Sequence, residues 1–141
     1  MRKITKIIIH CSDSEFGCRN VIEDWHQKRR FRKIGYHYVI CNGYLKNTKN
    51  YSESMDGQIQ EGRSVGLTGA HVKGHNSDSL GICLIGTTKF SQKQTESLLS
   101  LIKALMILFE VPVDNILGHY ELDQNKTCPN MNMDEIRKIL K

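Results

Sequence analysis

The chain has 141 residues, of which 39% are hydrophobic and two are prolines, so it suits one globular domain with a buried core and is too short for two ordinary domains. Its formal net charge of +5 and its isoelectric point near 9.0 favour an acidic partner, such as nucleic acid, anionic lipid or a bacterial wall polymer. No apolar run approaches the roughly 18 residues of a membrane span, so we expect no transmembrane segment.

The N-terminal sequence MRKITKIIIHCS combines a basic start with an isoleucine-rich run. The run is too short for the hydrophobic region of a signal peptide, and no small-residue cleavage site follows it. We therefore expect the protein to be made and kept in the cytoplasm unless something else releases it. Residues 3–10 form a β-branched run with little alternation, which is typical of a central strand covered on both faces.

The middle of the chain predicts a helix, a strand and a polar excursion. The sequence NVIEDWHQKRRF, residues 20–31, has helical periodicity, and we expect His26 on its surface. The sequence GYHYVICNG, residues 35–43, predicts a second strand that ends in an Asn-Gly turn. From Tyr44 to Gln60 the chain is polar and contains a second turn signal at Asp56-Gly57, which suggests an excursion or hairpin on the sheet.

The clearest helix begins after the buried strand LGICLIG, residues 80–86. Ser91 and Gln94 have capping-box spacing. The apolar residues that follow repeat on one helical face and are Leu98, Leu101, Ile102, Leu105, Met106 and Phe109. The chain therefore predicts a long helix over residues 91–110 that packs on the sheet.

Two short elements complete the pattern. The sequence DNILG, residues 114–118, predicts a short strand, and MDEIRKILK, residues 133–141, predicts a C-terminal helix with Ile136, Ile139 and Leu140 facing inward. The order strand, helix, strand, strand, helix, strand, helix predicts an α/β fold. We expect a single domain with a central mixed β-sheet flanked by helices.

The five cysteines contain no C-x-x-C pair, so the sequence signals neither a disulfide framework nor a zinc finger. Cys41 and Cys83 lie inside apolar strand-like runs, where we expect small buried side chains. Cys11 and Cys18 could form a bridge, but the expected cytoplasmic origin disfavours it.

Candidate metal ligands gather at the ends of the predicted strands. His10 closes the first strand, His119 follows the last, and Cys128 lies nine residues beyond His119 in a polar loop. Two neutral imidazoles and one thiolate can form a three-ligand tetrahedral zinc site whose fourth position holds a water molecule with a pKa near about 7. Single histidines at strand ends often have structural roles, so this spacing alone makes zinc a candidate and no more.

Four blocks of sequence occur in order between residues 7 and 130, namely IIIHCS, GYHYVI, EGRSVGLTGAHVKGHNSDSLGICLIG and ILGHYELDQNKTCPN. Together they resemble the zinc-dependent N-acetylmuramoyl-L-alanine amidases of the type 2 family, whose superfamily includes amidase-type phage lysozymes and animal peptidoglycan recognition proteins. The resemblance implies that residues 1–141 form one catalytic domain. Its activity would be hydrolysis of the amide bond between N-acetylmuramic acid and L-alanine in bacterial peptidoglycan.

The resemblance also implies a role for individual residues. His10, His119 and Cys128 match the family's three zinc ligands, and Tyr36 and Lys126 match the catalytic tyrosine and lysine of the phage-type enzymes. Amide hydrolysis needs an activated water, a stabilised oxyanion and a proton for the departing amine. A lysine suits the oxyanion, and a tyrosine can hydrogen-bond the nucleophile or relay a proton, but the sequence does not divide these roles.

The block AHVKGHNSDS supplies candidates for substrate binding. His71 and Asn76 match positions in the block that lines the family's substrate groove, so the resemblance implies that they contact the peptide or the sugar. His37 alternates with Tyr36 along the strand, and we expect it to be structural. Residues 41–60 replace the short DGT-like turn of many phage-type relatives, and this longer segment can change the width of the groove or add a contact surface.

The resemblance favours a bacteriolytic phage or prophage endolysin that acts on the cell wall after release. The alternative is a non-catalytic peptidoglycan-binding or regulatory protein on the same fold, since some phage amidases also bind a phage RNA polymerase. A nucleic-acid-binding protein would need clustered lysines and arginines with interleaved aromatic residues. Only KRRFRK, residues 28–33, comes near this pattern, so we expect no nucleic-acid partner.

Overall fold

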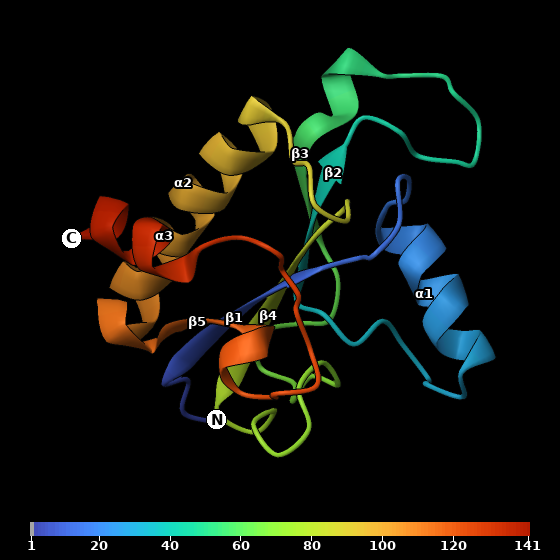
Figure 1. The fold of residues 1–141 in the computed structure, drawn as a ribbon. Coiled ribbons are helices and arrows are strands. Elements are labelled where there is room, and N and C mark those ends of the chain that lie inside the picture. The colour runs from blue at the N-terminus through green and yellow to red at the C-terminus, as the bar shows by residue number, and fades with distance from the viewer. Residues whose placement is uncertain (1) are drawn as a thin grey trace.

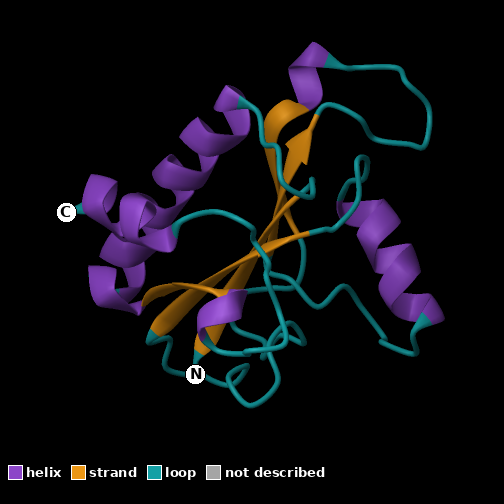
Figure 2. Ribbon diagram, viewed as in Figure 1, coloured by secondary structure: helices purple, strands orange, loops and turns teal. Residues whose placement is uncertain are grey.

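A computed structural model describes residues 2–141 and shows a five-stranded sheet between helices on both of its faces (Figures 1 and 2). The strands are β1 (Lys6–Cys11), β2 (Tyr38–Asn42), β3 (Asp56–Glu61), β4 (Ser79–Leu84) and β5 (Ile116–Gly118), and their order across the sheet is β3-β2-β4-β1-β5. β1 is parallel to β4 and β5, β2 is parallel to β4, and β3 is antiparallel to β2. The predicted single domain with a mixed sheet is therefore confirmed.

The helices divide between the two faces of the sheet (Figure 1). They are α1 (Arg19–Lys28), α2 (Gln92–Phe109) and α3 (Met133–Leu140), and three short 3-10 turns span Glu53–Met55, Val113–Asn115 and His119–Glu121. α1 covers one face, whereas α2 and α3 cover the other. Within residues 2–141 we find no helix that is both long and apolar enough to span a membrane.

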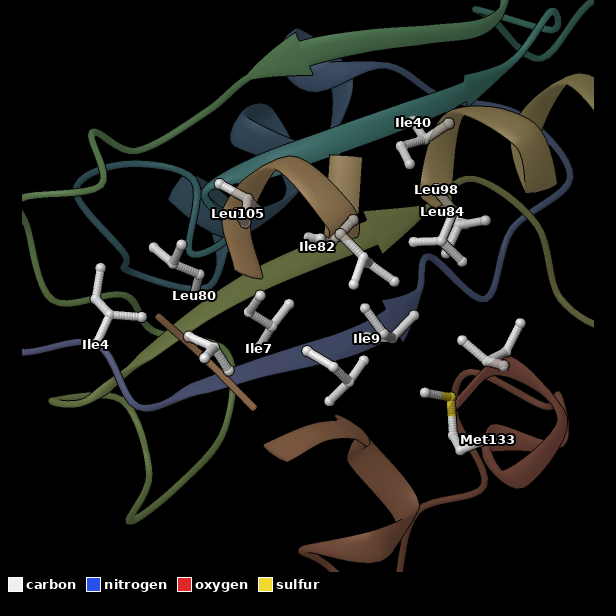
Figure 3. Close-up of a cluster of buried hydrophobic side chains, with 14 residues drawn as sticks. Ile4, Ile7, Ile9, Ile40, Leu80, Ile82, Leu84, Leu98, Leu105 and Met133 are labelled. Atoms are coloured by element: carbon white, nitrogen blue, oxygen red, sulfur yellow. The ribbon is translucent and has the colours of Figure 1, made fainter. Parts of the chain in front are cut away.

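β1 lies in the interior of the sheet, as its β-branched sequence predicts. Ile7, Ile8 and Ile9 are fully buried between the neighbouring strands and the helices. Ile7 and Ile9 point into the larger core cluster, where they share the space under α2 and α3 with side chains such as Leu98 and Met133 (Figure 3). Burial of each aliphatic side chain of this kind stabilises the folded state by roughly 1.5–3 kcal/mol, relative to leaving it exposed to solvent.

The opposite face of the sheet is only partly covered. Side chains alternate along a strand, so His10 points away from Ile7 and Ile9, toward the side of α1. A smaller core cluster on this side includes Ile22 of α1 and Val39 of β2. α1 has only ten residues, and the part of the sheet that it leaves uncovered lines a cavity.

The helix α2 agrees with its sequence signals. The Ser91 side chain accepts a hydrogen bond from the Gln94 backbone N–H (3.0 Å), and the Gln94 side chain accepts one from the Ser91 N–H (2.9 Å), so the predicted capping box is present. The inward face is also confirmed, because Leu98, Ile102 and Leu105 are buried.

The inward face predicted for α3 is partly wrong. Ile136 is buried, but Ile139 is 55% exposed. The helix begins at Met133, which is fully buried and fixes the inward stripe through Met133, Ile136 and Leu140. Helical spacing from Met133 therefore rotates Ile139 toward solvent.

The polar excursion forms a hairpin, but Asp56-Gly57 is not its turn. β3 begins at Asp56 and runs antiparallel to β2, with Ile40 opposite Ile59. Gly57 has a positive φ of 83°, and a Cβ there would lie 2.9 Å from backbone and side-chain atoms of Lys93. The glycine therefore allows the edge strand to pass close to the start of α2. Its role here is this close approach and not the formation of a tight turn.

Candidate active site

Two histidines meet at the carboxyl ends of β1 and β5. Ile9 pairs with Gly118 in this parallel ladder, and each of these two residues is followed in the sequence by a histidine. The Nδ1 atoms of His10 and His119 lie 3.1 Å apart although the residues are 109 positions apart in sequence. Neighbouring parallel strands end at the same edge of a sheet, so the topology brings the two imidazoles together.

Cys128 returns to the same point on the loop between β5 and α3. The loop closes through a hydrogen bond from the Tyr120 N–H to the Cys128 carbonyl oxygen (2.9 Å), and the Cys11 N–H donates to the Cys128 sulfur (2.9 Å). One ligand atom from each of His10, His119 and Cys128 lies within 4.8 Å of the others. The structure thus brings together the predicted metal ligands, whose role stays a prediction.

Burial keeps both imidazoles of this cluster neutral. It lowers the pKa of His10 well below its ordinary value, and the neighbouring rings of His71 and His119 oppose protonation further. Burial also lowers the pKa of His119, and the positive charge of Lys126 lowers it further. Neutral imidazoles offer lone pairs, which is the form that a metal ion needs.

The thiols of Cys11 and Cys128 interact directly. Their shared hydrogen bond lowers the pKa of Cys11 to about 7 and raises the pKa of Cys128. A thiolate on either sulfur would therefore accept a hydrogen bond from the other thiol. A cation beside the Cys128 sulfur would draw the negative charge to that atom, because the ion stabilises a thiolate directly. The expected burial of Cys41 and Cys83 is confirmed, and the five cysteines form no disulfide within residues 2–141.

A cavity of about 900 Å³ opens over the cluster. Its volume lies in the range of small-molecule and cofactor sites. Side chains from the end of α1, from the loop before β4 and from the loop after β5 line it, and they include Arg29, Phe31, Lys73, Asn76, Asp123 and Lys126. The cavity is therefore open to a substrate on the face of the sheet that α1 leaves uncovered.

Tyr36 lies at the wall of this cavity between two histidine rings. Its ring centroid is 5.0 Å from that of His10 and 5.4 Å from that of His26. Burial raises the pKa of Tyr36 well above its ordinary value, so the hydroxyl keeps its proton at neutral pH. The surface position predicted for His26 is wrong, because His26 is buried against Tyr36 and accepts a hydrogen bond from the Gly35 N–H (2.9 Å).

Lys126 lies on the exposed rim of the cavity, two residues before Cys128. Its backbone N–H donates to the carbonyl oxygen of Asp123 (3.0 Å), which turns the loop back toward the cluster. The charge of Lys126 opposes protonation of His119. The predicted lysine and tyrosine therefore line the same cavity as the predicted ligands, and their catalytic roles stay predictions.

His71 and Asn76 line the cavity as well, but several of their polar atoms bond within the protein. The two ring nitrogens of His71 contact His10 Nε2 (2.8 Å) and Ser79 Oγ (3.2 Å). Asn76 Oδ1 accepts hydrogen bonds from the backbone N–H groups of His71 (2.9 Å) and Val72 (3.0 Å). The predicted contacts of both residues with a substrate stay predictions. The expected structural role of His37 agrees with its complete burial and its bonds to the Gly81 N–H and the Leu67 carbonyl.

The sequence did not predict that Arg29 and Phe31 line the cavity. The Arg29 guanidinium lies 5.6 Å from the centre of the Phe31 ring, and both residues line the cavity. The predicted helix extended to Phe31, whereas α1 ends at Lys28 and Arg30 has a positive φ of 70°. This turn carries Phe31 back over His26, a contact that no periodicity signals.

Comparison with known proteins agrees with this geometry. The family profile described as N-acetylmuramoyl-L-alanine amidase matches residues 1–131. The endolysin of Escherichia phage T7 is 30% identical over 139 residues, which cover 90% of this chain and 81% of the endolysin. In fold, the chain resembles the N-acetylmuramoyl-L-alanine amidase LysC from Clostridium intestinale URNW, with a TM-score of 0.83, 24% identity, and coverage of 99% of this chain and 86% of LysC.

A further solved structure contains tracheal cytotoxin bound to the ectodomain complex of peptidoglycan recognition proteins LCa and LCx. The chain matches it with a TM-score of 0.73 and 26% identity, over 100% of this chain and 82% of that one. The family match and the similarity to the phage endolysin confirm the enzyme class that the sequence motifs predict. The chain belongs to the N-acetylmuramoyl-L-alanine amidase family and is an amidase similar to phage endolysins.

Proposed function

We propose that residues 1–141 form one zinc-dependent catalytic domain that cleaves the amide bond between N-acetylmuramic acid and L-alanine in bacterial peptidoglycan. The protein would be a phage or prophage endolysin that is made in the cytoplasm and acts on the wall after release. The observation that carries the metal is the group of two imidazole nitrogens and one sulfur within 4.8 Å at the cavity. The family match and the tracheal cytotoxin complex of a relative support peptidoglycan as the substrate.

The donor set fits zinc. His10, His119 and Cys128 would hold the ion through nitrogen and sulfur, whereas magnesium and calcium prefer oxygen ligands. The two facing Nδ1 atoms, 3.1 Å apart, suit a shared cation, because two neutral acceptors repel each other unless a proton or a metal ion lies between them. When bound, zinc would supply Lewis-acid activation of a water molecule and polarisation of the substrate carbonyl.

Tyr36 and Lys126 would complete the chemistry from the cavity wall. The Tyr36 hydroxyl stays protonated at neutral pH, so it can donate a hydrogen bond to the reacting groups and does not serve as a base. The Lys126 ammonium can stabilise the negative charge that develops on the carbonyl oxygen. Asn76 stays our candidate for contact with the peptide or the sugar.

The products of digestion test the proposed bond. Purified protein incubated with insoluble peptidoglycan should release free L-alanine amino termini and leave intact glycan strands without new reducing ends. Mass spectrometry of the soluble fraction distinguishes this outcome from glycan cleavage, which yields disaccharide peptides with new reducing ends. A non-catalytic binder would only co-sediment with the polymer. A chelator should abolish the release, and added zinc should restore it.

Metal analysis tests the ligand set. Freshly purified protein should contain about one zinc per chain, and Cys128→Ser should retain far less, because a three-ligand site loses affinity steeply without its thiolate. Cys18→Ser is the matched control, since Cys18 lies outside the cluster and its side chain does not cap α1. Full zinc retention in Cys128→Ser would remove this cysteine from the site.

A further inference from the structure

His71 lies directly behind His10, on the side away from the ligand cluster. His71 Nδ1 is 2.8 Å from His10 Nε2, and the two rings meet edge to face at 88°. On its other side, His71 Nε2 is 3.2 Å from Ser79 Oγ. A line of hydrogen-bonding groups therefore runs from the cluster through His10 and His71 to a fully buried serine on β4.

The sheet leaves a space of the size of this imidazole. Ser79, Gly81 and Cys83 alternate with the core residues of β4, and Gly81 lies opposite Ile8 in the parallel ladder. A Cβ at Gly81 would lie 2.6 Å from Cγ, 2.7 Å from Nδ1 and 2.8 Å from Cδ2 of His71. The ring thus occupies the volume that a side chain on β4 would need.

A second glycine and an asparagine hold His71 from the other sides. A Cβ at Gly69 would lie 2.6 Å from His71 Cδ2. Asn76 Oδ1 accepts the His71 backbone N–H (2.9 Å) and so fixes the loop that carries the ring. The position and the orientation of His71 are therefore determined by its surroundings before any ligand is present.

The chemistry of imidazole determines which nitrogen donates and which accepts in each of these hydrogen bonds. A neutral imidazole has one N–H and one lone pair, so His10 can offer Nδ1 to a metal only if its proton is on Nε2. That proton then points at His71 Nδ1, which accepts it when His71 carries its own proton on Nε2 and donates to Ser79. A metal-bound histidine usually donates its second N–H to a carboxylate, a backbone carbonyl or water. In this chain the Nδ1 atom of His71 takes that place.

We propose that His71 is a positioning residue, which accepts the His10 Nε2–H and thereby presents His10 Nδ1 to the metal, with Ser79 at the end of the chain of hydrogen bonds. The inference rests on the zinc site proposed above and deepens it. Both ring nitrogens of His71 are used inside the protein, so this role replaces the contact with the peptide or the sugar that the family resemblance implies for His71.

The tautomer of His10 tests the proposal without the metal. In ¹⁵N-labelled, metal-free protein, long-range ¹H–¹⁵N correlation spectra should show His10 protonated on Nε2. His119 should then be protonated on Nδ1, because the 3.1 Å contact between the two Nδ1 atoms needs one donor. Added zinc should move the His119 proton to Nε2 and leave that of His10 in place. A His10 protonated on Nδ1 in the metal-free wild type would overturn the proposal.

Variants at His71 test its effect on metal affinity. His71→Leu removes the acceptor, and competition with a chelator should show zinc binding weakened about 10- to 100-fold, as for other outer partners of metal ligands. His71→Asn keeps an acceptor near the position of Nδ1 and should restore most of the affinity. His75→Leu is the matched control on the same loop. Wild-type affinity and an unchanged His10 tautomer in His71→Leu would contradict the proposal, whereas a wild type that binds no zinc would refute the metal site itself.

Two glycine variants provide a second test if His71→Leu does not fold. Gly81→Ala keeps the imidazole but displaces it, because the new Cβ would overlap the His71 ring. It should change the His10 tautomer and weaken zinc binding. Gly66→Ala is its control, since a Cβ at Gly66 meets nothing within 4 Å. Equal zinc affinity and equal spectra in both glycine variants would count against the role of His71.

Discussion

The rings of His10, Tyr36 and His26 follow one another along the wall of the cavity, with centroid separations of 5.0 and 5.4 Å. Their burial sets their protonation, because it raises the pKa of Tyr36 and lowers the pKa of both histidines. These three rings therefore carry no charge at neutral pH. Lys126 on the rim brings a positive charge to the same space, where an anionic oxygen would form during amide hydrolysis.

At these two residues we expect a loss of rate without a loss of metal. Tyr36→Phe and Lys126→Ala should keep the zinc content and the folded circular dichroism spectrum while losing at least about tenfold in the rate of peptidoglycan hydrolysis, as is usual for acid-base and oxyanion groups. Lys73→Ala is a control for charge, because Lys73 also lines the cavity but matches no catalytic position. Near-normal rates in both variants would leave Tyr36 and Lys126 with structural roles.

At the scale of elements, the site depends on how α3 holds the loop after β5. Arg137 of α3 forms a two-fold ion pair with Glu121, at 2.8 and 2.9 Å, and also donates to the carbonyl oxygen of Ile116 (2.8 Å). Asn130 donates to the carbonyl oxygen of Thr87 beyond β4 (2.7 Å). These bonds fix both ends of the loop that carries Lys126 and Cys128. Such anchoring lets two loop residues keep a defined geometry.

The elements with strong local signals could be predicted from the sequence. β1 is buried on both faces, and α2 has a capping box and an apolar stripe. The sequence of each element therefore indicates both its type and the face that it buries. The strand β3 was harder to predict, because its sequence DGQIQE is polar. The strand is half-exposed and pairs with the sheet on one side only. The end of α1 at Lys28 could not be predicted either, since the positive φ of Arg30 decides it.

The same difference applies to the site. His10 and His119 lie at strand ends, and their proximity follows once β1 and β5 are known to be parallel neighbours. The contact between His71 and His10 follows from no sequence pattern, because it depends on where a loop crosses β4. Its clearest trace in the sequence is Gly81 within a buried strand, and a glycine inside a strand can equally mark a bulge or a bend.

For the whole molecule, the number of buried imidazoles has a consequence for stability. His10, His26, His37 and His71 are all buried. Burial lowers the pKa of His37 to about 4 from an ordinary value of 6.5, and the positive charge of Arg2, whose Nη2 lies 3.0 Å from His37 Nε2, opposes protonation further. His37 is therefore neutral in the folded protein at pH values at which the unfolded chain carries a proton.

This difference predicts a protein that loses stability as the pH falls. Between pH 6.5 and about 4 the unfolded state binds more protons at His37 than the folded state, so the stabilisation is fully present above pH 6.5 and is lost as the pH falls toward 4. For His37 alone, lowering the pH from about 7 to about 5 should cost about 2 kcal/mol. Urea unfolding of the metal-free protein at these two pH values measures the change.

The contribution of His37 can be separated from that of the other histidines with His37→Asn. The asparagine Oδ1 can accept the Gly81 N–H that His37 Nδ1 now accepts at 3.0 Å, but an amide does not titrate in this range. The variant should therefore lose about 2 kcal/mol less than the wild type between about pH 7 and about pH 5. His75→Asn, on the loop before β4 and only partly buried, should behave like the wild type. An equal loss in His37→Asn and the wild type would show that the proton uptake on unfolding occurs at other groups.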